Sequence, residues 1–270
     1  MYSRTYLLLQ NEGYLVQGCL RSALAALLKS SSAERGPLYV ALFNYSIGLE
    51  RLLKLSLLLD HCVANKGAFP TYAQIKSFGH DVGTLYKTAK AVTDRYQIEI
   101  PENCRTDGID ERLLELLTAF ADAKGRYFNL NALIGGGSGT DPLSEWGKLL
   151  TEIYKRDVPP LKRISDEEQV EAHAASMKET TVYLPATGFD GAVQAYEDFF
   201  ADHGKITLVM PEVVWRFARL LYPFQMLVFE LDQPLRSGRA DKPEDFPTMW
   251  EICAFCGPDK ESTLAEIRGY

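Results

Sequence analysis

Apolar residues recur at helical spacing along most of the chain, and the most apolar stretch runs from Leu38 to His61. Apolar positions cover most of the circumference of the helix that this stretch would form, so other helices should surround it. Pro37 suits the first turn of that helix, because a proline there gives up no helical hydrogen bond. The pattern therefore predicts a helical bundle organised around this segment.

Similar periodicity predicts further helices before and after the central one. They cover residues 14–29, 71–97 (or from 80, if broken near Gly79), 109–120, 142–153, 165–178, 190–200 and 211–232, and a last helix follows Thr248. The pairs Ser165 with Glu168 and Thr248 with Glu251 have the spacing of capping boxes. Pro223 lies inside one predicted helix and should kink it.

Two short β-branched segments, Thr180–Leu184 and Lys205–Met210, have the composition of strands. The predicted fold class is thus mainly α. It comprises a helical bundle over residues 1–158 and an acidic, mostly helical C-terminal region over residues 159–270 that can include two short strands.

The charge of the chain is unevenly distributed. The net charge is −7, and residues 161–270 carry 11 Lys and Arg against 19 Asp and Glu. Neither half is a polycation that would hold nucleic acid by charge alone. A nucleic-acid site would therefore need a local basic cluster, and the first half is the better place for it.

The composition favours a cytoplasmic protein. Asn44, Glu50 and Lys54 interrupt the apolar segment at 38–61, so no membrane span is predicted. The first ten residues lack the long apolar run of a signal peptide. Five scattered cysteines suit a reducing compartment better than a disulfide framework.

A polar stripe crosses the apolar helix. Glu50 and Lys54 are four residues apart, and His61 returns to nearly the same angle. Such pairs are commonly ion pairs at the edge of a core, which is one interpretation of the stripe. The other is that the stripe lines a functional site.

The segment from Arg126 to Asn131 combines an arginine with aromatic and amide side chains, just before a glycine-rich loop at residues 135–139. Arginine can bind phosphate through two hydrogen bonds while Tyr127 or Phe128 stacks on a base. Alternatively, the aromatic rings fill the core and Arg126 pairs with an acid. The loop lacks the Gly-Lys-Ser/Thr ending of a P-loop.

Metal and redox chemistry receive little support. Cys253 and Cys256 form a Cys-x-x-Cys pair, but no second pair or nearby histidine completes a zinc site. No thioredoxin-like βαβ pattern surrounds the pair either. Two cysteines packed in the last helix are the simpler interpretation, and we expect no metal or cofactor.

Three segments occur in a fixed order along the chain: Leu49–Lys54 in the long apolar helix, Gly79–Val82 followed by Leu85, and Arg126 with Tyr127. This set resembles the HEPN superfamily of helical domains, over about residues 14–155. The resemblance implies an up-down bundle that often forms a homodimer. It also implies one of two roles, metal-independent ribonuclease of antiviral defence or toxin–antitoxin systems, or non-catalytic binding of nucleotides or partner proteins.

The ribonuclease motif of that superfamily is an arginine followed four to six residues later by a histidine. The histidine would move the proton of the ribose 2′-hydroxyl, and the arginine would stabilise the charged phosphorane. Arg126 matches the arginine, but Asn131 stands five residues on, and no histidine of the chain follows an arginine at the required distance. The resemblance therefore names, as catalytic candidates, Arg126, Asn131 and His80, and as ligand-binding candidates, Tyr127, Asn129, Glu50 and Lys54.

Three hypotheses follow. The protein is a defence-type ribonuclease that uses Arg126, or a non-catalytic module that binds RNA or a nucleotide through Arg126 and Tyr127. In the third, it is an interaction protein whose acidic C-terminal region binds a basic partner or blocks the site of the helical domain. Asparagine has no useful pKa for proton transfer, which favours the second and third hypotheses.

Overall fold

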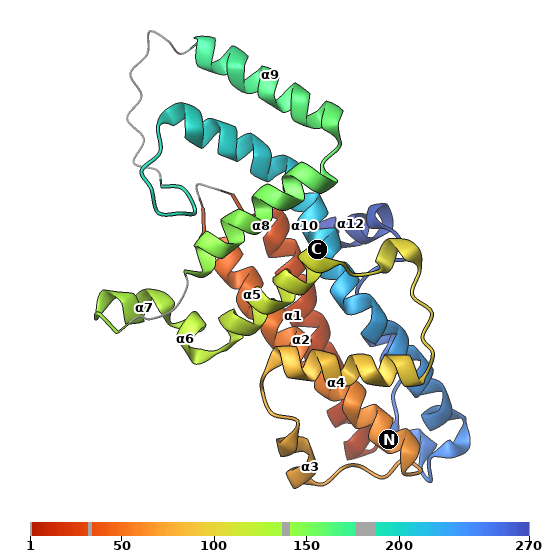
Figure 1. Cartoon of the computed structure of the whole chain (residues 1–270). Coiled ribbons are helices and arrows are strands. Elements are labelled where there is room, and N and C mark those ends of the chain that lie inside the picture. Colours follow the sequence, from red (N-terminus) through yellow and green to blue (C-terminus); the bar gives the residue numbers. More distant parts are fainter. Residues whose placement is uncertain (1, 32–33, 137–140, 177–186, 270) are drawn as a thin grey trace.

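The computed structural model describes residues 2–31, 34–136, 141–176 and 187–269. The described residues form a mainly α fold (Figure 1), which confirms the predicted fold class. Its α-helices are α1 (Arg4–Leu28), α2 (Gly36–Ala64), α3 (Tyr72–Ser77), α4 (Val82–Arg95), α5 (Gly108–Ala121), α6 (Ala123–Arg126), α7 (Phe128–Leu133), α8 (Pro142–Asp157), α9 (Pro160–Ser176), α10 (Tyr196–Pro234), α11 (Met249–Ile252) and α12 (Lys260–Arg268). Short 3₁₀ turns lie at Glu102–Cys104 and Pro243–Asp245, and a π turn follows α10 at Leu235–Arg239.

The centre of the fold is α2, as its apolar pattern predicts. It packs against α1, α4, α5 and α10, and Pro37 lies in its first turn. The approach of α1 is especially close at Gly48, where a Cβ atom would lie 2.7 Å from Leu20 Cγ. Only a residue without a side chain allows this spacing, because the interior is already filled.

The long helix α10 completes the core. One cluster of buried residues contains Leu20 and Leu49 from the N-terminal helices together with Phe217 and Phe224 from α10. The Tyr45 hydroxyl, on α2, donates to the Phe217 carbonyl oxygen at 2.6 Å. The expected boundary between residues 158 and 159 therefore does not divide the hydrophobic core. Figure 1 shows α10, in cyan to blue, running beside the red and orange hairpin of α1 and α2.

The strand expected at Lys205–Met210 is a helix instead. These residues lie inside α10, where Ile206, Val209 and Met210 are buried. Burial against α8 and α9 outweighs the β-propensity of the segment. The other expected strand, Thr180–Leu184, lies outside the described residues, and so does the part of the glycine-rich loop from residue 137. An isolated bridge joins Thr187 to Val193.

Several helix boundaries also differ from expectation. The first helix begins at Arg4 rather than at Tyr14, because the Ser3 side chain caps it by accepting from the Tyr6 N–H at 3.0 Å. Ser165 lies inside α9, which begins five residues earlier at Pro160. The helix expected from residue 190 begins only at Tyr196 and continues through Pro211 and Pro223.

The helix boundaries near the C-terminal end also differ from the expected ones. The capping box expected at Thr248 does not form, and α11 is only four residues long. The last helix starts instead at Lys260, where the Asp259 carboxylate accepts from the Ser262 N–H at 2.8 Å. Within the described ranges, no helix is long and apolar enough to cross a membrane.

Candidate functional site

A pocket of about 770 Å³ lies between α1 and α2. Residues of α3, of the loop before α4 and of α6 also line it. Its apolar wall includes Leu8 and Leu9 of α1, Leu55 and Leu58 of α2, and Ile75 of α3. Charged and ionisable side chains also line it, so the pocket presents apolar and ionic groups together.

Glu50, Lys54 and His80 meet in this pocket. The Lys54 Nζ atom donates to Glu50 Oε1 at 2.7 Å, and His80 Nδ1 lies 2.9 Å from the same oxygen. The distance from Lys54 Nζ to His80 Nδ1 is 3.3 Å. In one tautomer Nδ1–H donates to Glu50, and in the other the bare Nδ1 accepts from Lys54. The side chain of His80 is 86% exposed, whereas those of Glu50 and Lys54 are 23% and 21% exposed.

The local sequence explains why these three residues converge. Glu50 and Lys54 lie one turn apart on the same face of α2. His80 stands between Gly79, which has a positive φ of 72°, and Asp81, which caps α4 by accepting from the Thr84 N–H at 2.7 Å. Hydrogen bonds from Thr84 hold the pKa of Asp81 below its ordinary value. A left-handed glycine followed by a helix cap therefore turns the chain so that His80 reaches α2.

A second ion pair lies next to this cluster. The Arg51 guanidinium, through Nη1, donates to both carboxylate oxygens of Glu12 at 2.7 and 3.0 Å. Glu12 belongs to α1 and Arg51 to α2, so the pair joins the two helices at the pocket. Glu12 carries no signal in the sequence pattern, because the periodicity predicts that the first helix begins after it, at Tyr14. Arg51 belongs to the motif Leu49–Lys54, but its position in that motif does not predict a partner on α1.

Arg126 is another cation of the pocket lining. It lies at the end of α6, lines the pocket and donates through Nη2 to the Ala121 carbonyl oxygen at 3.0 Å. Its guanidinium carbon is 5.2 Å from the centre of the Phe43 ring. In the part of the chain that the structure describes, Arg126 forms no salt bridge, unlike Arg51 and Lys54. It is thus a cation without a carboxylate partner at the edge of a pocket.

The remaining candidates lie outside the lining of this pocket. Tyr127 is exposed, and the Asn129 side-chain amide donates to the Tyr39 hydroxyl at 3.0 Å. The backbone of Asn131 bonds within its own turn, to Tyr127 and to Gly136. His61, expected on the same stripe as Glu50, is not among the lining residues. The structure therefore brings together Glu50, Lys54, His80 and Arg126, and it separates Tyr127, Asn129 and Asn131 from them.

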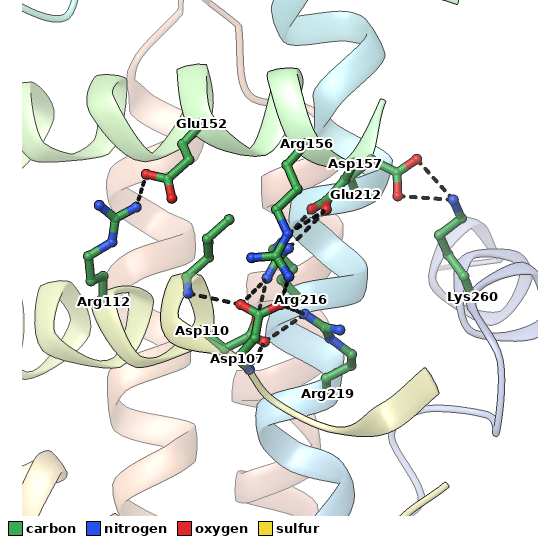
Figure 2. Close-up of polar contacts among 11 residues, drawn as sticks. Asp107, Asp110, Arg112, Glu152, Arg156, Asp157, Glu212, Arg216, Arg219 and Lys260 are labelled. Atoms are coloured by element: carbon green, nitrogen blue, oxygen red, sulfur yellow. Dashed lines mark hydrogen bonds and ion pairs between the residues drawn. The ribbon is translucent and has the colours of Figure 1, made fainter. Parts of the chain in front are cut away.

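A separate cluster of buried and half-buried charges lies between α5, α8 and α10 (Figure 2). The side chain of Arg216 on α10 is only 3% exposed and donates to three aspartates. Its bonds to Asp157 measure 2.5 and 2.9 Å, the bond to Asp107 measures 3.0 Å and the bond to Asp110 3.1 Å. Arg219 donates to Asp110 at 2.6 Å, and Arg156 donates to Asp107 at 2.6 Å.

This cluster is a structural connection rather than a site. Burial alone would raise the pKa of Asp107, but hydrogen bonds from Arg216 and from the Ile109 N–H hold that pKa at about 2. Burial would likewise lower the pKa of Arg216, and its carboxylate partners Asp157 and Asp110 raise it instead. Each charge is compensated by a neighbour, and no member of the cluster lines the pocket of α1 and α2.

The cysteine pair is also buried. Burial raises the pKa of the Cys253 thiol to about 12 and that of Cys256 further. Cys256 Sγ donates to the Ala218 carbonyl oxygen at 3.5 Å. Among the described residues, no group of three or more His, Cys, Asp or Glu side chains has a metal-binding arrangement.

No family model matches the chain, and no curated protein or solved structure matches it either.

Proposed function

We propose that the protein binds a phosphate-bearing ligand, a nucleotide or the end of an RNA strand, in the pocket between α1 and α2. The observation that carries this proposal is that Arg126 lines the pocket and pairs with no carboxylate of the described residues. A guanidinium free of acidic partners can donate two parallel hydrogen bonds to a phosphate.

The apolar part of the pocket lining suits the rest of such a ligand. Leu8, Leu55, Leu58 and Ile75 provide apolar surface, and Phe69 adds an aromatic ring. A base or other flat apolar group can be buried there, as in most small-molecule sites. Lys54 and His80, which share Glu50, provide further donors in the same lining.

The HEPN resemblance supports this proposal. Its motif residues Glu50, Lys54, His80 and Arg126 all line one pocket, although they come from three separate segments. A role in bacterial antiviral defence or a toxin–antitoxin system, in the cytoplasm, belongs to the proposal through this analogy alone.

Fluorescence anisotropy tests ligand binding directly. Wild-type protein is titrated into a fluorescent ATP analogue and, separately, into a fluorescein-labelled RNA decamer. Arg126→Ala should weaken binding at least about tenfold, because a charged hydrogen bond is lost. Arg105→Ala is the matched control, since Arg105 is exposed, forms no salt bridge in the described residues and lies outside the pocket. Absence of binding to both probes, or an equal loss in both variants, would contradict the proposal.

A second candidate function is RNA cleavage at the same pocket, and the contact between His80 and Glu50 favours it. In this mechanism His80 accepts the proton of the ribose 2′-hydroxyl, and the 2′-oxygen attacks the phosphorus. The bond to the 5′-oxygen breaks, and that oxygen takes a proton from water. Arg126 stabilises the added charge on the phosphate, and Glu50 orients the imidazole. The products are a 2′,3′-cyclic phosphate and a 5′-hydroxyl.

The cleavage test uses total RNA in EDTA with the variants Arg126→Ala, His80→Gln and Asn131→Ala. The first two should abolish cleavage, whereas Asn131→Ala should retain it, because Asn131 lies outside the pocket lining. Intact RNA with the wild-type protein would eliminate this candidate and leave the binding proposal standing.

The alternative is that the protein acts through protein contacts, either with a partner protein or as a homodimer. The α6–α7 arm projects from the bundle in Figure 1 and exposes Leu130, Leu133 and Ile134, of which the last two are more than 80% exposed. Neighbouring exposed apolar side chains are typical of protein interfaces. A native mass equal to one chain, unchanged by Leu133→Asp, would count against the homodimer.

A further inference from the structure

A second cavity of about 540 Å³ lies where α8, α9 and the first turns of α10 meet. Its apolar part includes Leu150 of α8, Ile206 and Val209 of α10, and Phe189. Arg163 of α9 and Gln194, in the turn that leads into α10, provide polar groups. It shares no lining residue with the pocket between α1 and α2.

Two polar atoms of this cavity lack partners. Arg163 Nε, a donor, and Gln194 Oε1, an acceptor, are buried, and neither forms a hydrogen bond among the described residues. Buried polar atoms are nearly always paired, because an unpaired one gives up its bonds to water without compensation. An unpaired donor and an unpaired acceptor in the same cavity point to a ligand that supplies an acceptor for the first and a donor for the second.

The position of Gln194 is fixed by its surroundings. Its side-chain amide nitrogen donates to Asp202 Oδ2 at 2.5 Å. Because a carboxylate needs a donor, this contact determines which end of the amide is the oxygen and leaves Oε1 without a partner. Arg35 holds the other end of the turn by donating to Thr187 Oγ1 at 2.8 Å and to the Gly188 carbonyl oxygen at 2.7 Å.

The cavity lining contains side chains of both charges that form no salt bridge among the described residues. Lys155 and Arg163 form no salt bridge within the described ranges, and the same holds for Glu167 and Asp190. Lys155, Glu167 and Asp190 lie at the exposed rim of the cavity, whereas Arg163 is half-buried. A ligand that carries both charges can pair with groups of both signs in this lining.

We propose that this cavity binds a small zwitterion of the amino-acid class. The ligand carboxylate accepts hydrogen bonds from Arg163, and its ammonium group donates to Gln194 Oε1. Leu150, Ile206 and Val209 surround the ligand side chain, so apolar amino acids such as leucine and phenylalanine are preferred. This proposal is independent of phosphate binding between α1 and α2.

The experiment measures binding of free amino acids to the full chain. Each of the common amino acids is tested singly by thermal shift, and those that raise the melting temperature are titrated by calorimetry. Acetate and butylamine, which carry one charge each, serve as ligand controls. We expect saturable binding of an apolar amino acid and at least tenfold weaker binding of both controls.

Variants separate a ligand role of Arg163 from a structural one. Arg163→Met should weaken binding at least about tenfold, and Arg163→Lys, which keeps the charge without Nε–H, should also weaken it. Without ligand, neither variant should lower the melting temperature, since a buried unpaired donor is removed. Lys162→Met, at the adjacent exposed position outside the cavity, should bind as the wild type does. Absence of any binding amino acid, equal binding of acetate, or unchanged affinity in Arg163→Met would overturn the proposal.

Discussion

His80 and Glu50 lie thirty residues apart in the chain, yet His80 Nδ1 is 2.9 Å from Glu50 Oε1. The same carboxylate oxygen accepts from Lys54 at 2.7 Å. Glu50 therefore holds two potential phosphate donors in place and adds a negative charge to the wall of the pocket that we propose for phosphate. Removing the charge of Glu50 therefore separates its repulsion of a phosphate from its role in holding Lys54 and His80.

Glu50→Gln should strengthen binding of the fluorescent ATP analogue about two- to fivefold, because a negative charge is removed beside the phosphate. The substitution keeps the size of the side chain and its ability to bond Lys54 and His80, but it removes one negative charge beside the ligand. Glu115→Gln is the control, because Glu115 is exposed on α5 and outside the pocket. Anisotropy titrations at low and high salt measure the change, which should shrink as salt increases. Weaker binding in Glu50→Gln at every salt concentration would contradict this prediction and show that Glu50 acts by positioning Lys54 and His80.

Two helical glycines should respond to alanine in opposite directions. Gly48→Ala places a Cβ atom 2.7 Å from Leu20 Cγ, so it should lower the free energy of unfolding by about 1–3 kcal/mol through overpacking. Gly18→Ala, in α1, meets no atom within 4 Å and should raise it by up to about 1 kcal/mol through helix propensity. Urea denaturation of both variants measures the difference. Equal effects would mean that α1 and α2 are not packed as closely as described.

Periodicity predicted most of the helices because their buried faces are regular. The boundaries of α2 differ from the expected Leu38 and His61 by only a few residues, since the segment is apolar on nearly every side. The helical conformation of Lys205–Met210 could not be predicted from its local sequence. Its β-branched residues favour a strand by themselves, but α10 buries Ile206 and Val209 against helices that only the folded chain brings near.

The candidate site was predictable to the extent that its residues are local. Glu50 and Lys54 follow from helical spacing, and Arg126 stands out by its aromatic and amide neighbours, whereas His80 was named by the resemblance. Their meeting depends on the turn at Gly79 and on the position of α6, which no local pattern specifies. Glu12 was missed because Ser3, the cap that starts α1 early, was not recognised as a helix start.

The buried cluster around Arg216 should be essential for stability. Arg216→Met removes the shared partner of Asp107, Asp110 and Asp157 and leaves buried negative charge uncompensated. A loss of about 3–5 kcal/mol in the free energy of unfolding is expected. Arg112→Met, which breaks the exposed pair of Arg112 with Glu152, should cost about 1 kcal/mol or less. Chemical denaturation of the two variants measures both values, and similar losses would contradict the burial of the cluster.

Asp107 should make the stability of the protein depend on pH under acidic conditions. Its pKa is about 2 in the folded protein, against an ordinary value of 3.8. A carboxyl group with a lowered pKa stabilises the folded state above its unfolded pKa, and this contribution is lost as the pH falls towards the folded pKa. The difference between wild type and Asp107→Asn should therefore be about 2 kcal/mol at pH 6 and should fall towards zero between pH 4 and pH 2.

Asparagine suits this comparison because it can still cap α5 by accepting from the Ile109 N–H, as the Asp107 carboxylate does at 2.8 Å. The variant therefore removes the charge that pairs with Arg216 and Arg156 while it keeps the helix start. Urea denaturation at pH 6, 4, 3 and 2.5 gives the free energy of unfolding of both proteins. A difference that stays constant over this range would mean that the pKa of Asp107 is not lowered by folding, and the cluster would then contribute through packing alone.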